Sequence, residues 1–121
     1  MGSFSKIALN GGAGVIPVGP AGGPDTLIHT TGTSTSILDE VWLWANNSQS
    51  SDIYLYLYLG TSSGPSANVM VLLVPSESTI LAIPGIPISG NGTVGRPVNA
   101  IATSMMTGNI TVFGYVNRIT P

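Results

Sequence analysis

The sequence contains no cysteine among its 121 residues, and only 7% of them are charged. Soluble domains usually carry about 25% charged residues, so something other than charge keeps this surface in contact with water. The missing cysteine excludes disulfide bonds, and the stability of the fold must come from packing or assembly. The low charge also excludes disorder that is driven by repulsion between like charges.

Basic residues are particularly few, with three Lys and Arg against five Asp and Glu and a net charge of −2. Nucleic-acid binding rests on a cationic surface, so we expect no nucleic-acid partner. Anionic membranes are disfavoured for the same reason, and the longest apolar run, residues 53–59, is too short to span a bilayer as a helix. Residues 1–25 lack the basic start and apolar centre of a signal peptide, so we expect neither a targeting signal nor a membrane partner.

Long helices are excluded as well. The chain has 16 glycines and 9 prolines, and no apolar stripe recurs at the helical spacing of about 3.6 residues. Glycine and proline are concentrated in residues 10–24, which we interpret as extended chain. We therefore predict a flexible N-terminal arm over residues 1–24, followed by one β-sandwich domain over residues 25–121.

After residue 25 the chain consists of short β-branched and aromatic runs separated by turn residues, at a spacing of about 8–12 residues. This spacing indicates strands near residues 26–31, 37–45, 53–60, 68–74, 78–83, 86–89, 98–104 and 109–119. Eight strands favour an all-β, antiparallel, jelly-roll-like sandwich over an immunoglobulin domain, which would normally show a Cys, Trp, Cys framework. Pro84 and Pro87 place their segment on an edge strand or on a crossover between sheets.

Two runs, residues 41–45 and 53–59, alternate with period two and are joined by a polar loop of seven residues. Successive side chains of a strand point to opposite faces. We therefore expect an aliphatic core face made of Val41, Leu43, Ala45, Ile53, Leu55, Leu57 and Leu59. The other, outer face is aromatic and made of Trp42, Trp44, Tyr54, Tyr56 and Tyr58. In a hairpin with Ala45 opposite Ile53, Trp44 would lie opposite Tyr54 and Trp42 opposite Tyr56.

These five aromatic residues are our candidate protein interface, because monomers usually do not leave an apolar surface of roughly several hundred Å² exposed. Two alternatives remain open. The N-terminal arm or another strand could cover the face within the same molecule. The rings could also stack on sugars as a carbohydrate-binding platform.

The sequence offers little material for a catalytic site, since hydrolases and transferases need a nucleophile and a base within hydrogen-bond reach. His29 is the single histidine and lies in a predicted strand, on one face with Leu27 and Thr31, so we assign it a structural role. Asp39 and Glu40 are neighbours on a strand, point to opposite faces and are expected to be solvated. We predict no catalytic residues, no metal site, no cofactor and no enzyme activity.

Three segments carry a resemblance to known proteins, namely residues 24–29 (PDTLIH), 38–47 (LDEVWLWANN) and 110–119 (ITVFGYVNRI). Over residues 24–120 the chain resembles small virion structural proteins of tailed bacteriophages. Its size and near-absence of charge look most like capsid decoration or cement proteins. Proteins of that kind are β-rich, often trimeric, and clamp neighbouring subunits of the capsid.

The resemblance implies a viral structural protein, located on the capsid surface of the virion and in the host cytoplasm during assembly. Its partners would be the major capsid protein and further copies of itself, with a trimer favoured. Two alternative functions stay open. One is a structural protein of the phage tail or neck, and the other is a carbohydrate-binding module for host recognition that uses the outer aromatic face.

Overall fold

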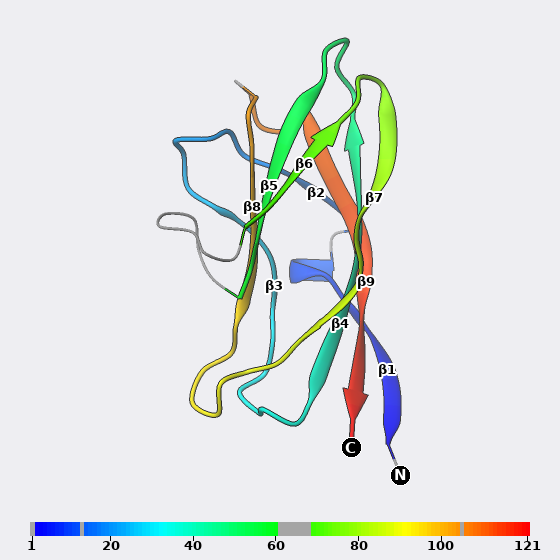
Figure 1. The fold of residues 1–121 in the computed structure, drawn as a ribbon, viewed down its shortest axis with the longest axis vertical. Coiled ribbons are helices and arrows are strands. Elements are labelled where there is room, and N and C mark those ends of the chain that lie inside the picture. Colours follow the sequence, from blue (N-terminus) through cyan, green and yellow to red (C-terminus); the bar gives the residue numbers. More distant parts are fainter. Residues whose placement is uncertain (1, 13, 61–68, 105) are drawn as a thin grey trace.

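The computed structural model describes residues 2–12, 14–60, 69–104 and 106–121, which form an all-β fold (Figure 1). In chain order the elements are β1 (Ser3–Ala8), a short 3₁₀ helix η1 (Asn10–Gly12), β2 (Val15–Pro17), β3 (Thr26–Thr30), β4 (Leu38–Asn47), β5 (Ile53–Leu59), β6 (Val69–Val74), β7 (Ser78–Ile88), β8 (Pro97–Ala102) and β9 (Ile110–Thr120). No helix in these ranges is long and apolar enough to cross a membrane.

The strands form two antiparallel sheets that face each other. Sheet A has the order β1-β9-β4-β7, with β2 also paired to β9, and sheet B has the order β3-β8-β5-β6. From β2 to β9 the chain changes sheet at every connection except the one between β5 and β6. This alternation is typical of a jelly roll, so the predicted jelly-roll-like antiparallel sandwich is confirmed.

The core lies between the two sheets, and the period-two alternation sorts side chains as predicted. Both central strands, β4 and β5, direct their aliphatic side chains inward and their aromatic side chains outward. Of the expected core face, Leu59 is half-buried and the other members are buried, namely Val41, Leu43, Ala45, Ile53, Leu55 and Leu57. Burying these side chains is the main favourable contribution to folding.

The predicted hairpin between the two alternating runs is wrong. β4 pairs with β9 and β7 in sheet A, whereas β5 pairs with β8 and β6 in sheet B. Packed sheets lie about 10 Å apart, a distance that the polar loop between the strands is long enough to cross. Crossing lets the two aliphatic faces bury each other, so the aromatic faces point away from the core in opposite directions.

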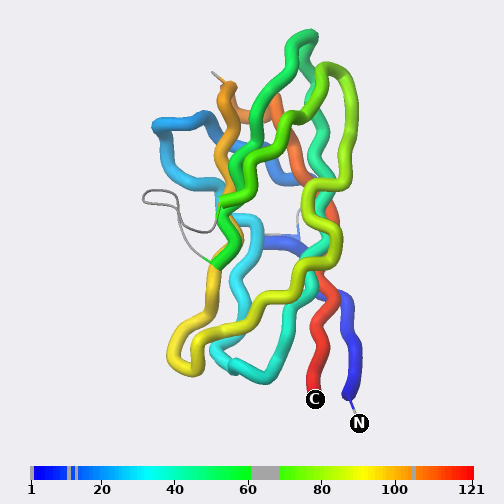
Figure 2. Tube along the Cα trace, viewed as in Figure 1, coloured from blue at the N-terminus to red at the C-terminus, as the bar shows by residue number. Residues whose placement is uncertain are grey.

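The predicted boundary between an arm and a sandwich at residue 25 does not match the packing. β1 and β2 both pair with β9, whose 11 residues are long enough for two short partners. Leu9, Ile16 and Val18 are part of the core. Glycine has a different use in this segment than flexibility. Gly12, for example, adopts a left-handed backbone with φ +64. In Figure 2 the two ends of the chain run side by side, as expected from the pairing of β1 with β9.

Strand β7 joins two predicted strands into one. Its register against β4 shifts twice, so that Ala82 and Gly85 have no partner residue on β4. At Gly85 the Trp42 ring lies so close that an added Cβ atom would be 2.6 Å from a ring carbon. These bulges accommodate Pro84 and Pro87 in a strand at the edge of sheet A. The predicted edge position of this proline-containing segment is confirmed.

Candidate functional site

The outer face of sheet A carries an aromatic cluster made of Trp42, Trp44, Phe113 and Tyr115. Trp42 lies opposite Tyr115, and Trp44 lies opposite Phe113, on the neighbouring strands β4 and β9. The ring centroids of the two pairs are 6.5 and 6.1 Å apart, and the rings are nearly parallel. Cross-strand stacking of this kind stabilises a sheet, and it leaves all four rings half-buried.

Charged groups contact the edges of this aromatic cluster. The Lys6 ammonium lies 4.9 Å from the ring centroid of Tyr115, within the range of a cation–π contact. The indole N–H of Trp42 donates a hydrogen bond of 2.8 Å to Oε1 of Glu40. Lys6 and Glu40 lie on either side of Asn117 in one row across the sheet. A polar row therefore borders the cluster on this face.

The outer face of sheet B is apolar and more open. Tyr54 lies opposite Leu73, and Tyr56 lies opposite Val71, on β5 and β6. Tyr54, Val71 and Leu73 are 49%, 53% and 46% exposed, and Leu27 of β3 is exposed as well. We term these five residues the sheet B apolar face. Within their described bounds, the strands of sheet B contain no Lys, Arg, Asp or Glu.

The five aromatic residues predicted as one interface do not share a face. Trp42 and Trp44 lie on sheet A, whereas Tyr54, Tyr56 and Tyr58 belong to sheet B on the other side of the core. Tyr58 is also buried. The predicted single interface is therefore replaced by two separate surfaces. The carbohydrate-binding alternative loses the five-ring platform on which it depended.

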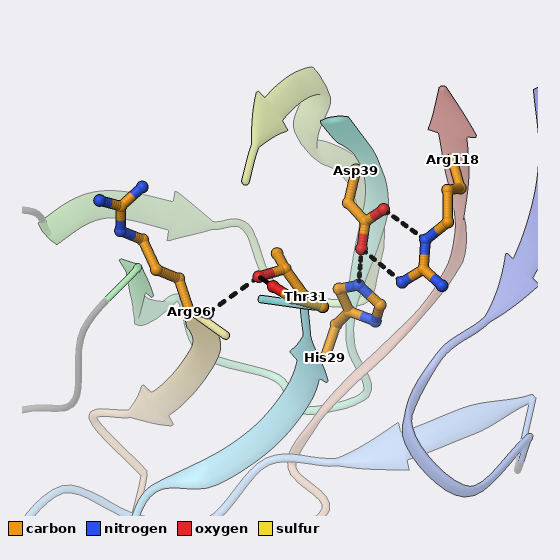
Figure 3. A network of polar contacts seen from close by, with 6 residues as sticks. His29, Thr31, Asp39, Arg96 and Arg118 are labelled. Carbon is orange, nitrogen blue, oxygen red and sulfur yellow. Dashed lines mark hydrogen bonds and ion pairs between the residues drawn. The ribbon is translucent and has the colours of Figure 1, made fainter. Parts of the chain in front are cut away.

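A polar network, buried at His29 and Asp39 and half-buried at Arg118, links the two sheets (Figure 3). It joins His29 of β3 in sheet B to Asp39 of β4 and Arg118 of β9 in sheet A. Nε2 of His29 lies 2.7 Å from Oδ2 of Asp39. Arg118 donates two hydrogen bonds, from Nε to Oδ1 at 2.8 Å and from Nη2 to Oδ2 at 2.9 Å. Both carboxylate oxygens of Asp39 therefore accept from neighbouring side chains.

Two expectations about these residues are corrected. His29 was expected to share a face with Leu27, but a register shift in β3 turns His29 into the core while Leu27 stays exposed. Asp39 was expected to be solvated, but it is only 1% exposed. Its burial is possible because Arg118 supplies the opposite charge directly across the sheet. Glu40 does point to the opposite face, as predicted.

The ionisation of Asp39 follows from these contacts. Burial, the strongest single influence, raises the pKa of the carboxyl group, but the hydrogen bonds from Arg118 and His29 and the Arg118 charge together outweigh it. The pKa of Asp39 therefore lies below its ordinary value. The hydrogen bond to Asp39 correspondingly raises the pKa of Arg118. The pair is held in its charged form across the pH range of cells.

An Asp-His pair orients the imidazole in hydrolytic triads, but here the surroundings favour a structural role. His29 is buried, and the Asp39 carboxylate is neutralised by Arg118. The hydroxyl of Thr31 donates to the carbonyl of Gly32 and accepts from the backbone N–H of Arg96, so it is directed elsewhere. Among the described residues, no three His, Cys, Asp or Glu side chains gather as metal ligands would.

Surface hollows formed by described residues are a further place to look for reactive groups. One of them has a volume of about 440 Å³ and is lined by Leu38, Leu59, Gly60, Pro87, Ile88, Ser89 and Arg96. Arg96 is its only charged residue, and its guanidinium donates to the carbonyl of Ser89. No acid or base in this lining could complete a reaction with it.

Sequence reasoning missed the partners of the residues that it singled out. Phe113 and Tyr115 alternate with Val112 in β9, so their outward direction could have been found from period two. Arg118 could not have been paired with Asp39 in this way, because the two are 79 positions apart. Only the register between β4 and β9 brings these two residues together.

No family model matches the sequence, and no curated protein or solved structure is significantly similar to it.

Proposed function

We propose that this protein is a structural component of a larger protein assembly and that it attaches through the sheet B apolar face. The observation that carries this proposal is an exposed, uncharged, apolar surface on a regular sheet. Apolar surface of this kind is typical of protein-protein contact sites. A sheet is already ordered before binding, so little conformational entropy is lost on attachment.

We propose further that the assembly is the capsid of a tailed bacteriophage, with the major capsid protein as partner. This step rests on the resemblance of residues 24–120 to small virion proteins. The jelly-roll fold supports it, since this fold is common among viral capsid proteins. A protein that binds only the assembled lattice shifts the equilibrium toward that lattice by its binding free energy. Many copies would thus stabilise a capsid without catalysis.

The test compares two aromatic-to-serine variants on different surfaces. Tyr54 belongs to the sheet B apolar face, whereas Phe4 is exposed on the outer face of β1 in sheet A. Capsids lacking the protein are mixed with wild type, Tyr54→Ser or Phe4→Ser, and bound copies per major capsid protein are counted after sedimentation. We expect Tyr54→Ser to weaken binding by at least about tenfold, because a buried aromatic anchor contributes about 2 kcal/mol or more.

Phe4→Ser should bind like wild type. If only Phe4→Ser loses binding, the attachment surface is on sheet A, and the proposed attachment through the sheet B apolar face is wrong. A heat challenge of capsids with and without the protein tests stabilisation. Equal disruption temperatures would contradict the capsid role, and a low copy number confined to the tail or neck would favour that alternative.

A further inference from the structure

The four sheet edges of this sandwich differ in how they are protected. Sheet A ends in β7 on one side and in β1 and β2 on the other, and sheet B ends in β3 and β6. An edge strand presents unpaired backbone N–H and C=O groups that can pair with another chain. Proteins therefore usually protect such edges with lysine, proline, bulges or covering segments.

Three of the four edges carry such protection. β1 contains Lys6. β7 contains Pro84 and Pro87 and two bulges against β4. β3 is interrupted by a register shift after Leu27, and η1 packs beside it. Each of these features interferes with the regular addition of a further strand.

Strand β6 has no lysine, proline or register shift within its bounds. Its sequence, VMVLLV, contains no charge, proline or glycine, and it pairs with β5 without a register shift. Val71 and Leu73 are exposed, while Val74 is fully buried in the core and fixes one end of the strand. Among the described strands only β5 pairs with β6, so no described strand pairs with the other edge of β6.

We infer that this edge is an interface between two copies of the chain, which pair antiparallel along β6. Antiparallel pairing of β6 with itself opposes no like charges, because the strand has none. A two-fold dimer needs only one self-complementary edge per copy, whereas a ring or a filament built by strand pairing needs two different edges. One unprotected edge therefore fits an assembly that closes at two copies.

The dimer would join the two copies of sheet B into one continuous sheet. The sheet B apolar face of each copy would then continue into that of the other, since Val71 and Leu73 lie on the shared strand. The inference goes beyond the proposed function and does not depend on it, because the pairing belongs to the free protein. A trimer, which the resemblance favours, would need a surface other than β6.

The first test uses the absence of cysteine from the sequence. Val71→Cys introduces one thiol on β6, and Val94→Cys introduces one on a loop at a site with similar exposure, 53% against 55%. Both free proteins are oxidised under mild conditions at micromolar concentration. We expect rapid formation of disulfide-linked dimer for Val71→Cys, because residues near the two-fold axis of an antiparallel pair lie opposite each other. Equal cross-linking of the two variants would overturn the inference.

The second test introduces charges of the same sign on both sides of the two-fold axis of the dimer. Val71→Lys and Val71→Glu should each weaken dimerisation by at least about tenfold, because like charges would lie close together across the interface. An equal mixture of the two should recover dimers in analytical ultracentrifugation, and Val94→Lys should dimerise like wild type. Circular dichroism verifies the fold of each variant.

Three outcomes would overturn the inference. They are a monomeric wild type at micromolar concentration, an oligomer that is insensitive to the Val71 variants, and a mixture that fails to recover dimers. All of these measurements are made without capsids. Failure of capsid binding and failure of dimerisation can therefore be distinguished.

Discussion

Sheet A and sheet B share one core but differ in where their charges lie. Within the described strands, all charged residues are in sheet A, namely Lys6, Asp39, Glu40 and Arg118. Each of them contacts another side chain of sheet A. Asp39 also contacts His29 of sheet B. Sheet B is left with an uncharged outer face and an unprotected edge. The polar contacts of sheet A stabilise the monomer, and we propose that the outer face and edge of sheet B serve assembly.

The largest effect is expected from Asp39→Asn, which removes the charge at the centre of the buried network. Both carboxylate oxygens accept hydrogen bonds, and an amide nitrogen cannot accept one. Breaking a buried pair by removing one partner costs about 3–5 kcal/mol, so we expect a loss of that order in the free energy of unfolding. Urea unfolding followed by tryptophan fluorescence measures it.

The matched control is Glu77→Gln, because Glu77 is an exposed carboxylate in the turn before β7. Its neutralisation should change stability by less than about 0.5 kcal/mol. If Asp39→Asn is no more destabilising than this control, the network does not stabilise the sandwich. The proposed difference between sheet A, stabilised by contacts of its charged residues, and sheet B, which lacks such contacts on its outer face, would then lose its main support.

A smaller effect is expected from truncation of the outer aromatic residues. Trp44→Ala removes a half-buried ring stacked on Phe113, and should lower the free energy of unfolding by about 2 kcal/mol. Tyr54→Ala on sheet B removes an exposed ring and should cost less than about 1 kcal/mol. Chemical unfolding of both variants compares the two faces directly. Equal losses would show that the faces do not differ in their contribution to the monomer.

The strands and the core could be predicted because both follow from local alternation. In β4 and β5 every second side chain is aliphatic, and one face of each strand must be buried. The jelly-roll class also followed from the number and spacing of such runs. These features depend on neighbouring residues alone.

The candidate surfaces could not be predicted in full because they depend on pairing between distant segments. The alternation of β4 and β5 is the same whether they form a hairpin or face each other across the core, and only the second arrangement occurs. The pairing of β1 and β2 with β9 likewise depends on a free edge more than 90 positions away along the chain. The residues of β1 and β2 alone do not indicate which distant strand will have an unpaired edge.

The smallest effect is expected from acid, and it sharpens the role of Asp39. Because the pKa of Asp39 in the folded protein lies below the ordinary value of 3.8, its ionised form stabilises the fold. This contribution is fully present above the unfolded-state pKa, and it is lost as the pH falls through the lower pKa of the folded state. From neutral pH to about pH 5 the stability difference between wild type and Asp39→Asn should therefore stay constant. Below pH 3.8 the difference should narrow, as urea unfolding at a series of pH values would show. A difference that already narrows near neutral pH would mean that a group other than Asp39 controls the stability of the link between the two sheets.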